Sequence, residues 1–157
     1  MVRVFFFLSR WPLSLLHALG LCMGWLAYAL SPSYRRRLNE HARQAGLSLG
    51  QRLRAVGQAG RMVAELPRLW GRPREQALGD RVQWRQVEQL DQAVLEGKGI
   101  IILTPHLGCF EIVAQGYAER HGALKPITAL YRPSRQAWLA DVMVHARNRP
   151  GMVASPA

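Results

Sequence analysis

The chain has 157 residues, a length typical of one domain, and a formal net charge of +11 at pH 7. Lys98 and Lys125 are the only lysines, so this charge is nearly all arginine. It favours an anionic partner, such as phospholipid headgroups, a phosphorylated glycolipid, an acidic carrier protein or nucleic acid. Two cysteines without disulfide or metal-ligand spacing argue against a disulfide scaffold and fit a reducing compartment. Because the sequence has no base-reading module, we expect no nucleic acid among its partners.

The N-terminus is apolar. Leu13 to Leu30 form an uncharged run of 18 residues, at the lower edge of the roughly 17–25 residues that cross a membrane as a helix. Arg3 and Arg10 precede this run, and four arginines follow it, namely Arg35, Arg36, Arg37 and Arg43. The positive-inside rule then places the rest of the chain in the cytoplasm. We therefore predict a membrane anchor or span over residues 1–32 and a cytoplasmic domain over residues 33–157.

Two other interpretations of the apolar segment remain open. It resembles a secretory signal peptide in its basic start and in the small-x-small site Ala27-Tyr28-Ala29, but the triple arginine that follows disfavours export. Alternatively, it forms a helix that lies on the bilayer rather than crossing it. We predict that the segment associates with the membrane, and the sequence does not decide whether it spans the bilayer or lies on its surface.

The middle of the chain is predicted to be helical. Apolar residues recur at helical spacing over residues 33–70, with a break marked by Gly46 and Gly50. The arginines between them form a solvated face, which beside an anchor also attracts anionic headgroups. A loop follows at residues 71–74, then a short strand or extended connection at 81–84. A helix over residues 86–95 ends at Gly97.

The last third alternates between strands and helices. Residues 100–103 are predicted to form a buried strand that Thr104-Pro105 ends, because proline cannot donate to a strand ladder. A helix over 110–118, a strand over 127–131 and a helix over 135–147 follow, and a further strand begins where the chain ends. Connections of this length imply parallel strands. The predicted fold class is α/β, with an N-terminal membrane-associated helix and a helical segment followed by an incomplete βαβα unit.

His106 and Glu111 bracket the predicted turn between the first strand and its helix. On one continuous helix the two side chains would point about 140° apart, but across a turn they can meet. A carboxylate that accepts a hydrogen bond from one imidazole nitrogen leaves the other free to take a proton, as in a catalytic triad without its serine. The alternatives are a histidine without a catalytic role and, less favoured, a nucleophilic Cys109.

Four segments carry a resemblance to a known family. In chain order they are Gly97-Lys98-Gly99-Ile100, Thr104-Pro-His-Leu-Gly-Cys-Phe-Glu111, Tyr131-Arg132-Pro133 and Arg147-Asn148-Arg149. In this order they resemble the bacterial lipid A biosynthesis acyltransferases, the late lauroyl and myristoyl acyltransferases of Kdo2-lipid IVA. The wider group of glycerolipid-type acyltransferases carries H-x4-D or H-x4-E.

The resemblance implies transfer of an acyl chain from acyl carrier protein to a hydroxyl of a phosphorylated glycolipid acceptor at the bacterial inner membrane. It implies that His106 is the base and Glu111 its orienting partner, and that Arg132, Arg147 and Arg149 bind substrate. No cofactor, metal ion or covalent acyl-enzyme is expected. For the arginines, the alternative is that Arg132 precedes a turn and that the other two end a helix.

One departure from the family leaves alternatives open. Members of the family continue well past the position equivalent to Ala157, so the resemblance implies a catalytic domain that is incomplete at its C-terminus. The alternatives to lipid A acyl transfer are an inactive membrane-associated chain that binds anionic lipid and a related glycerophospholipid acyltransferase.

Overall fold

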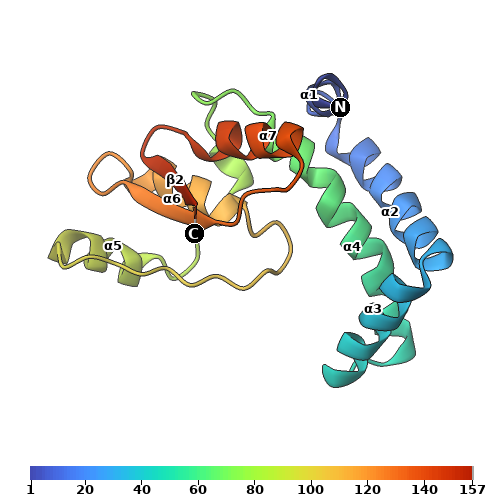
Figure 1. The fold of residues 1–157 in the computed structure, drawn as a ribbon. Helices are drawn as coiled ribbons and strands as arrows, with labels where there is room; N and C mark the ends of the chain where they lie inside the picture. The colour runs from blue at the N-terminus through green and yellow to red at the C-terminus, as the bar shows by residue number, and fades with distance from the viewer. Residues whose placement is uncertain (157) are drawn as a thin grey trace. The chain divides into compact units, whose positions relative to one another are not determined.

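The computed structural model describes residues 1–156, with residue 81 described by its backbone alone. The chain forms two compact units, drawn in Figure 1. We call residues 4–68 the N-terminal unit, and residues 69–156 together with the first three residues the C-terminal unit. The sequence placed a boundary at residue 32, between a membrane anchor and a cytoplasmic domain. That distinction concerns the membrane and remains a prediction.

The N-terminal unit consists of helices. They are α1 (Val2–Leu8), α2 (Leu13–Leu30), α3 (Pro32–Gln44) and α4 (Leu49–Trp70), of which α1 and α4 extend by two residues each into the C-terminal unit. The helix α2 coincides with the uncharged run, and it is long and apolar enough to be a candidate membrane span. Ser31 caps α3 by accepting a hydrogen bond from the Tyr34 amide at 3.3 Å, with Pro32 at the first helical position. The predicted break near Gly46 and Gly50 is confirmed.

Glycines let α2 and α4 pack with their backbones in contact, as Figure 1 shows for the two neighbouring helices. A Cβ on Gly20 would lie 2.6 Å from the Gly60 carbonyl oxygen, and a Cβ on Gly24 would lie 2.6 Å from that of Val56. A Cβ on Gly60 would lie 2.8 Å from the Gly24 Cα and still closer to the Gly20 carbonyl oxygen. No side chain fits there without separating the helices.

Replacing Gly60 with alanine is therefore expected to destabilise the N-terminal unit. Overpacking costs about 1–3 kcal/mol, partly offset by the helix propensity of alanine, about 1 kcal/mol better than that of glycine. At Gly50, also in α4, an added Cβ would meet nothing within 4 Å, so Gly50→Ala keeps only the propensity gain. Thermal unfolding in detergent micelles followed by circular dichroism should show a lower Tm for Gly60→Ala and an unchanged or higher Tm for Gly50→Ala. Equal shifts would contradict the close packing.

The C-terminal unit contains a parallel strand pair. Its elements are a short 3-10 turn (Gly79–Arg81), α5 (Glu88–Glu96), α6 (Ile112–His121), β1 (Ile127–Tyr131), α7 (Ala137–Arg147) and β2 (Met152–Pro156). In the register of the pair, Ile127 lies opposite Met152 and Tyr131 opposite Pro156, and α7 forms the crossover. The predicted strand at 127–131, the helix that follows it and the strand near the end of the chain are confirmed. Gly97 ends α5 in the left-handed conformation, as expected.

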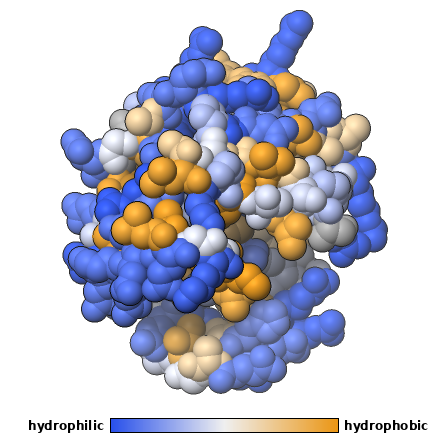
Figure 2. All heavy atoms as spheres, turned by 90° about the vertical axis from the view of Figure 1, so that its left-hand side faces the viewer, coloured by the Kyte–Doolittle hydropathy of each residue, from blue (hydrophilic) through white to orange (hydrophobic). Residues whose placement is uncertain are grey.

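The predicted strand at residues 100–103 is wrong. These residues form no strand, and Ile101 and Leu103 are each 89 % exposed. Figure 1 shows the coil that joins α5 to α6, and Figure 2 shows hydrophobic residues at the surface among hydrophilic ones. A strand needs a neighbouring backbone to satisfy its amides, and in the described residues the sheet consists of β1 and β2 only. The fold is α/β, but its order in this region is helix, strand, helix, strand instead of βαβα.

Candidate active site

His106 lies in a tightly turned loop that leads into α6. The Leu107 amide donates to the Pro105 carbonyl at 2.9 Å, and the Phe110 amide donates to the Gly108 carbonyl at 3.0 Å. The imidazole packs against the Phe110 ring, with the ring centroids 4.1 Å apart and the planes inclined at 37°. The side chain is otherwise exposed, so its ring nitrogens are accessible to a substrate.

Glu111 occupies the N-cap position of α6, which begins at Ile112. The helix predicted over residues 110–118 placed Glu111 in its first turn, so the observed helix begins two residues later. A carboxylate is favoured at this end of a helix, where the backbone amides point outwards and the helix dipole is positive. The Glu111 side chain is only 10 % exposed. A carboxylate with so little exposure to solvent requires a partner for its charge.

That partner is Arg147, at the end of α7. Its Nη2 donates to Glu111 Oε1, and its Nε donates to Oε2 at 3.3 Å, so the guanidinium binds the carboxylate through two hydrogen bonds. The Arg147 side chain is 12 % exposed, and its guanidinium carbon lies 5.0 Å from the centre of the Tyr131 ring and 5.7 Å from that of Trp70. The pair thus joins the start of α6 to the end of α7, beside the last residues of β1 and α4.

The predicted contact between His106 and Glu111 is not formed. Within residues 1–156 no hydrogen bond joins the two side chains, and both Glu111 oxygens bond to Arg147. Hydrogen bonds of catalytic groups often tighten only when substrate binds. The catalytic dyad therefore remains a prediction. In such a dyad, Glu111 would have to accept from His106 while both of its oxygens also accept from Arg147.

Arg132 directly follows β1 and is exposed, next to the Tyr131 ring on which Arg147 packs. The sequence placed Arg132 and His106 at one edge of a sheet because each was expected to follow a parallel strand. Since residues 100–103 form no strand, this reason does not apply. No hydrogen bond, ion pair or ring contact joins the two residues in the described part of the chain.

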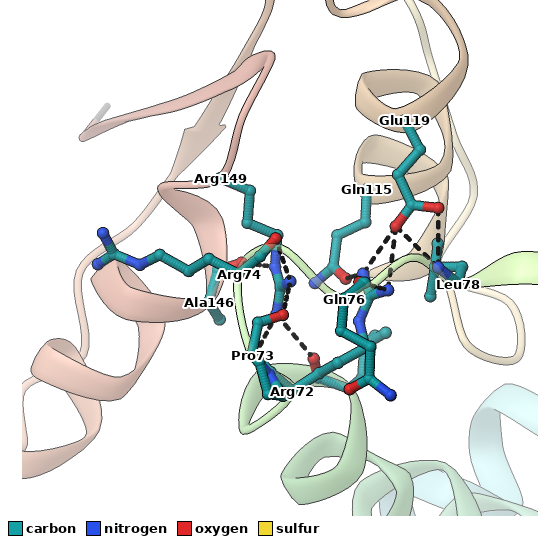
Figure 3. Close-up of polar contacts among 10 residues, drawn as sticks. Arg72, Pro73, Arg74, Gln76, Leu78, Gln115, Glu119, Ala146 and Arg149 are labelled. Atoms are coloured by element: carbon teal, nitrogen blue, oxygen red, sulfur yellow. Dashed lines mark hydrogen bonds and ion pairs between the residues drawn. The ribbon is translucent and has the colours of Figure 1, made fainter.

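Arg149 is buried, 8 % exposed, and its guanidinium donates to backbone carbonyls. Figure 3 shows this cluster. The closest acceptors are the carbonyl oxygens of Arg72 at 2.8 Å and of Pro73 and Ala146 at 3.0 Å, with those of Leu69 and Arg74 at 3.4 Å. Burial lowers the pKa of Arg149 to about 10, so the group stays charged at neutral pH. This geometry favours a structural role for Arg149; the substrate contact that the resemblance implies remains a prediction.

Arg72 extends the same cluster to α6, and sequence reasoning assigned it only to a loop. It donates to Gln115 Oε1 at 2.8 Å and to Glu119 Oε1 at 3.0 Å, while the second oxygen of Glu119 accepts from the Leu78 amide at 2.8 Å (Figure 3). Arg72 and Arg149 therefore fix the segment after α4 against α6 and α7, the helices that present Glu111 and Arg147. No local sequence signal marks partners separated by more than 40 residues.

Replacing Arg149 with methionine is expected to destabilise the C-terminal unit by about 2–4 kcal/mol, because several buried carbonyls lose their donor. Arg74 is the matched control, since its side chain is exposed and points away from the cluster in Figure 3. Arg74→Met should change the free energy of unfolding by no more than about 0.5 kcal/mol. Denaturant unfolding of the full chain in detergent measures both. Similar values for the two variants would show that Arg149 does not stabilise the unit.

Comparison with known proteins shows which family the sequence matches. The sequence model of the family described as bacterial lipid A biosynthesis acyltransferase matches residues 51–155. The matched region includes the described loop, helices and strands that carry His106, Glu111, Arg132, Arg147 and Arg149. No curated protein and no solved structure matches the chain. From the match over residues 51–155, the chain belongs to the bacterial lipid A biosynthesis acyltransferase family.

Proposed function

We propose that the chain transfers a fatty acyl group from acyl carrier protein to a hydroxyl of a phosphorylated lipid A precursor of the Kdo2-lipid IVA type. The observation that carries this proposal is the family match, which spans His106, Glu111 and the three arginines. The exposure of His106 supports it, because a general base must reach a hydroxyl on a large acceptor.

In the proposed reaction, one imidazole nitrogen of His106 accepts the proton of the acceptor hydroxyl. The oxygen attacks the thioester carbonyl of the donor, and a tetrahedral oxyanion forms. Collapse of this intermediate breaks the carbon–sulfur bond, and the departing thiolate takes the proton from the imidazolium. A nearby cation or backbone amide stabilises the oxyanion. The substrate hydroxyl is the nucleophile, so the reaction needs no covalent acyl-enzyme, cofactor or metal ion.

Glu111 is proposed to orient His106 while it remains paired with Arg147. A carboxylate has about four lone-pair sites, so Glu111 can accept a hydrogen bond from the imidazole in addition to the two from Arg147. This requires the loop at residues 104–110 to bring the imidazole towards α6 when substrate binds. Arg147 then acts as a positioning residue that holds the orienting carboxylate.

Arg132 is proposed to bind a phosphate of the acceptor. Its guanidinium is exposed at the end of β1, and its fork of donors matches a phosphate in a two-point contact. The positive charge of the chain suits both an acidic carrier protein and a phosphorylated acceptor. The proposed location is the cytoplasmic face of the inner membrane, for which α2 is the candidate anchor.

Two alternatives share parts of this proposal. In a chain that binds anionic lipid without acyl transfer, Glu111 would serve only as the partner of Arg147, which donates to both of its oxygens. A glycerophospholipid acyltransferase would use the same base with another acceptor.

A competition between acceptors tests the proposal. Membranes containing the full chain are given acylated carrier protein with equal concentrations of Kdo2-lipid IVA and a lysophospholipid. The proposal predicts acylation of the glycolipid in preference. Preferential acylation of the lysophospholipid would establish the glycerophospholipid alternative, and transfer to neither acceptor by membrane-bound protein would favour the non-catalytic one.

A further inference from the structure

Within the N-terminal unit, α4 contacts α2 and the residues just before it, from Trp11 to Gly24. At one end, Arg68 donates to the Trp11 carbonyl at 2.7 Å. About one turn away on α4, Glu65 Oε1 lies 2.7 Å from His17 Nε2 of α2. The contacts of Gly60 and Val56 with α2 continue to Gly24. As the residue numbers rise along α2, those of the contacting residues on α4 decrease, so the two helices run antiparallel. Polar contacts and backbone packing both fix this pairing.

The helix α2 is apolar on all sides, yet α4 covers only a narrow stripe of it. The buried residues of α2 are Leu16, Gly20 and Gly24. The large apolar side chains exposed on α2 are Leu13, Leu15, Leu19, Met23, Trp25, Leu26 and Leu30, and α1 adds Val2, Val4 and Phe7. A helix that is hydrophobic all round is stable only when it is buried in protein or in lipid. Most of the α2 surface therefore requires a cover that α4 does not provide.

The helix α4 is unsuited to the interior of a bilayer. Between its ends it carries Arg52, Arg54, Arg61, Glu65 and Arg68. Each charge at the centre of a membrane costs about 2.5–3.5 kcal/mol even on insertion scales, which give the lowest values. A bilayer-spanning α2 would draw α4 in with it or would lose the Gly60 packing and the His17–Glu65 contact. With 18 residues at about 1.5 Å rise each, α2 is also shorter than the roughly 30 Å hydrocarbon core.

We propose that α2 and α4 lie together in the interface of an anionic phospholipid bilayer, with the exposed apolar side chains of α2 among the acyl chains, and that α2 does not cross the membrane. The arginines suit this placement. Arg10 precedes α2, and Arg35, Arg36 and Arg37 follow it in α3. All of them stay on one side of the bilayer, where they attract anionic headgroups. Membrane binding of this kind does not depend on the proposed acyl transfer.

Cysteine accessibility tests whether α2 crosses. In the full chain with Cys22→Ala and Cys109→Ala, single cysteines are introduced by Arg10→Cys and Gln44→Cys, exposed positions on either side of α2. Inverted and right-side-out inner-membrane vesicles are treated with a membrane-impermeant maleimide, and labelling after detergent sets the maximum. The proposal predicts that both cysteines react in the same type of vesicle. Labelling of the two in opposite vesicle types would overturn it.

Flotation with liposomes tests the lipid-facing side. Met23→Glu places a charge on the exposed face of α2, and Gln58→Glu makes the same change in charge at an exposed position of α4. With vesicles rich in phosphatidylglycerol, Met23→Glu should lower the partition coefficient by about tenfold or more, which corresponds to about 1.4 kcal/mol. Gln58→Glu should lower it by less than about threefold. Equal losses, or no loss for Met23→Glu, would contradict the assignment of the lipid-facing side.

Discussion

Replacing His106 with alanine is expected to lower the rate of acyl transfer by about 10²–10⁴-fold, the usual contribution of a general base. The imidazole is exposed and contacts mainly the Phe110 ring, so its removal should leave the fold unchanged. The measurement is the initial rate of transfer to Kdo2-lipid IVA by membranes with matched amounts of each variant. The expected loss is in kcat, because the base acts on the reacting hydroxyl and adds little to binding.

His41 provides the matched control for this substitution. It is an exposed histidine in the last turn of α3, away from the family motifs. His41→Ala should keep the parental rate within a factor of about two, since surface substitutions shift the folding free energy by no more than about 0.5 kcal/mol. If His106→Ala retained the parental rate, or if both histidine variants lost it equally, His106 would not be the base.

The second large effect is expected at the buried pair of Glu111 and Arg147. Glu111→Gln removes one charge and leaves the Arg147 guanidinium buried without its counter-ion. Breaking a buried pair in this way costs about 3–5 kcal/mol of folding free energy. Denaturant unfolding should show this loss, and acyl transfer should fall as well if Glu111 orients His106.

A double variant separates the structural role of Glu111 from its role in catalysis. In Glu111→Gln with Arg147→Met no buried charge is left unpaired, so most of the lost stability should return. Transfer should stay low, because the imidazole has lost its orienting carboxylate. Recovery of both stability and activity would show that Glu111 acts only as the partner of Arg147. Failure to regain stability would contradict the ion pair as the source of the loss.

Much of the fold follows from local signals in the sequence. The uncharged run from Leu13 to Leu30 forms α2. Ser31 as the cap and Pro32 as the first helical residue set the start of α3. Gly97 ends α5 because glycine tolerates the left-handed conformation, and β-branched and aromatic residues mark β1. In each case, neighbouring residues contain the information that decides the structure.

Where partners are distant, the sequence is a weaker guide. Residues 100–103 have the composition of a strand, but a strand forms only where another backbone pairs with it, and this partner is missing in the described residues. Glu111 was predicted to bond with His106, five residues away, whereas its partner Arg147 lies 36 residues away. The Arg149 contacts with the segment after α4 span still longer separations.

The candidate site was found through its motif rather than its geometry. His106, Glu111 and Arg132 were identified by residue type, spacing and family resemblance, and the family match over residues 51–155 includes them all. Periodicity and composition do not reveal that Glu111 and Arg147 are paired and mostly shielded from solvent. Such a pair arises where the start of α6 meets the end of α7, an arrangement that the sequence specifies only through the complete fold.

The most direct test of acyl transfer is the mass of the acceptor. Membranes containing the full chain are incubated with Kdo2-lipid IVA and acylated carrier protein, with free fatty acid replacing the acylated carrier in the control. The proposed function predicts that the glycolipid gains the mass of one ester-linked acyl chain only when the carrier thioester is present. An unchanged acceptor mass, with the protein shown to be folded and membrane-bound, would contradict it.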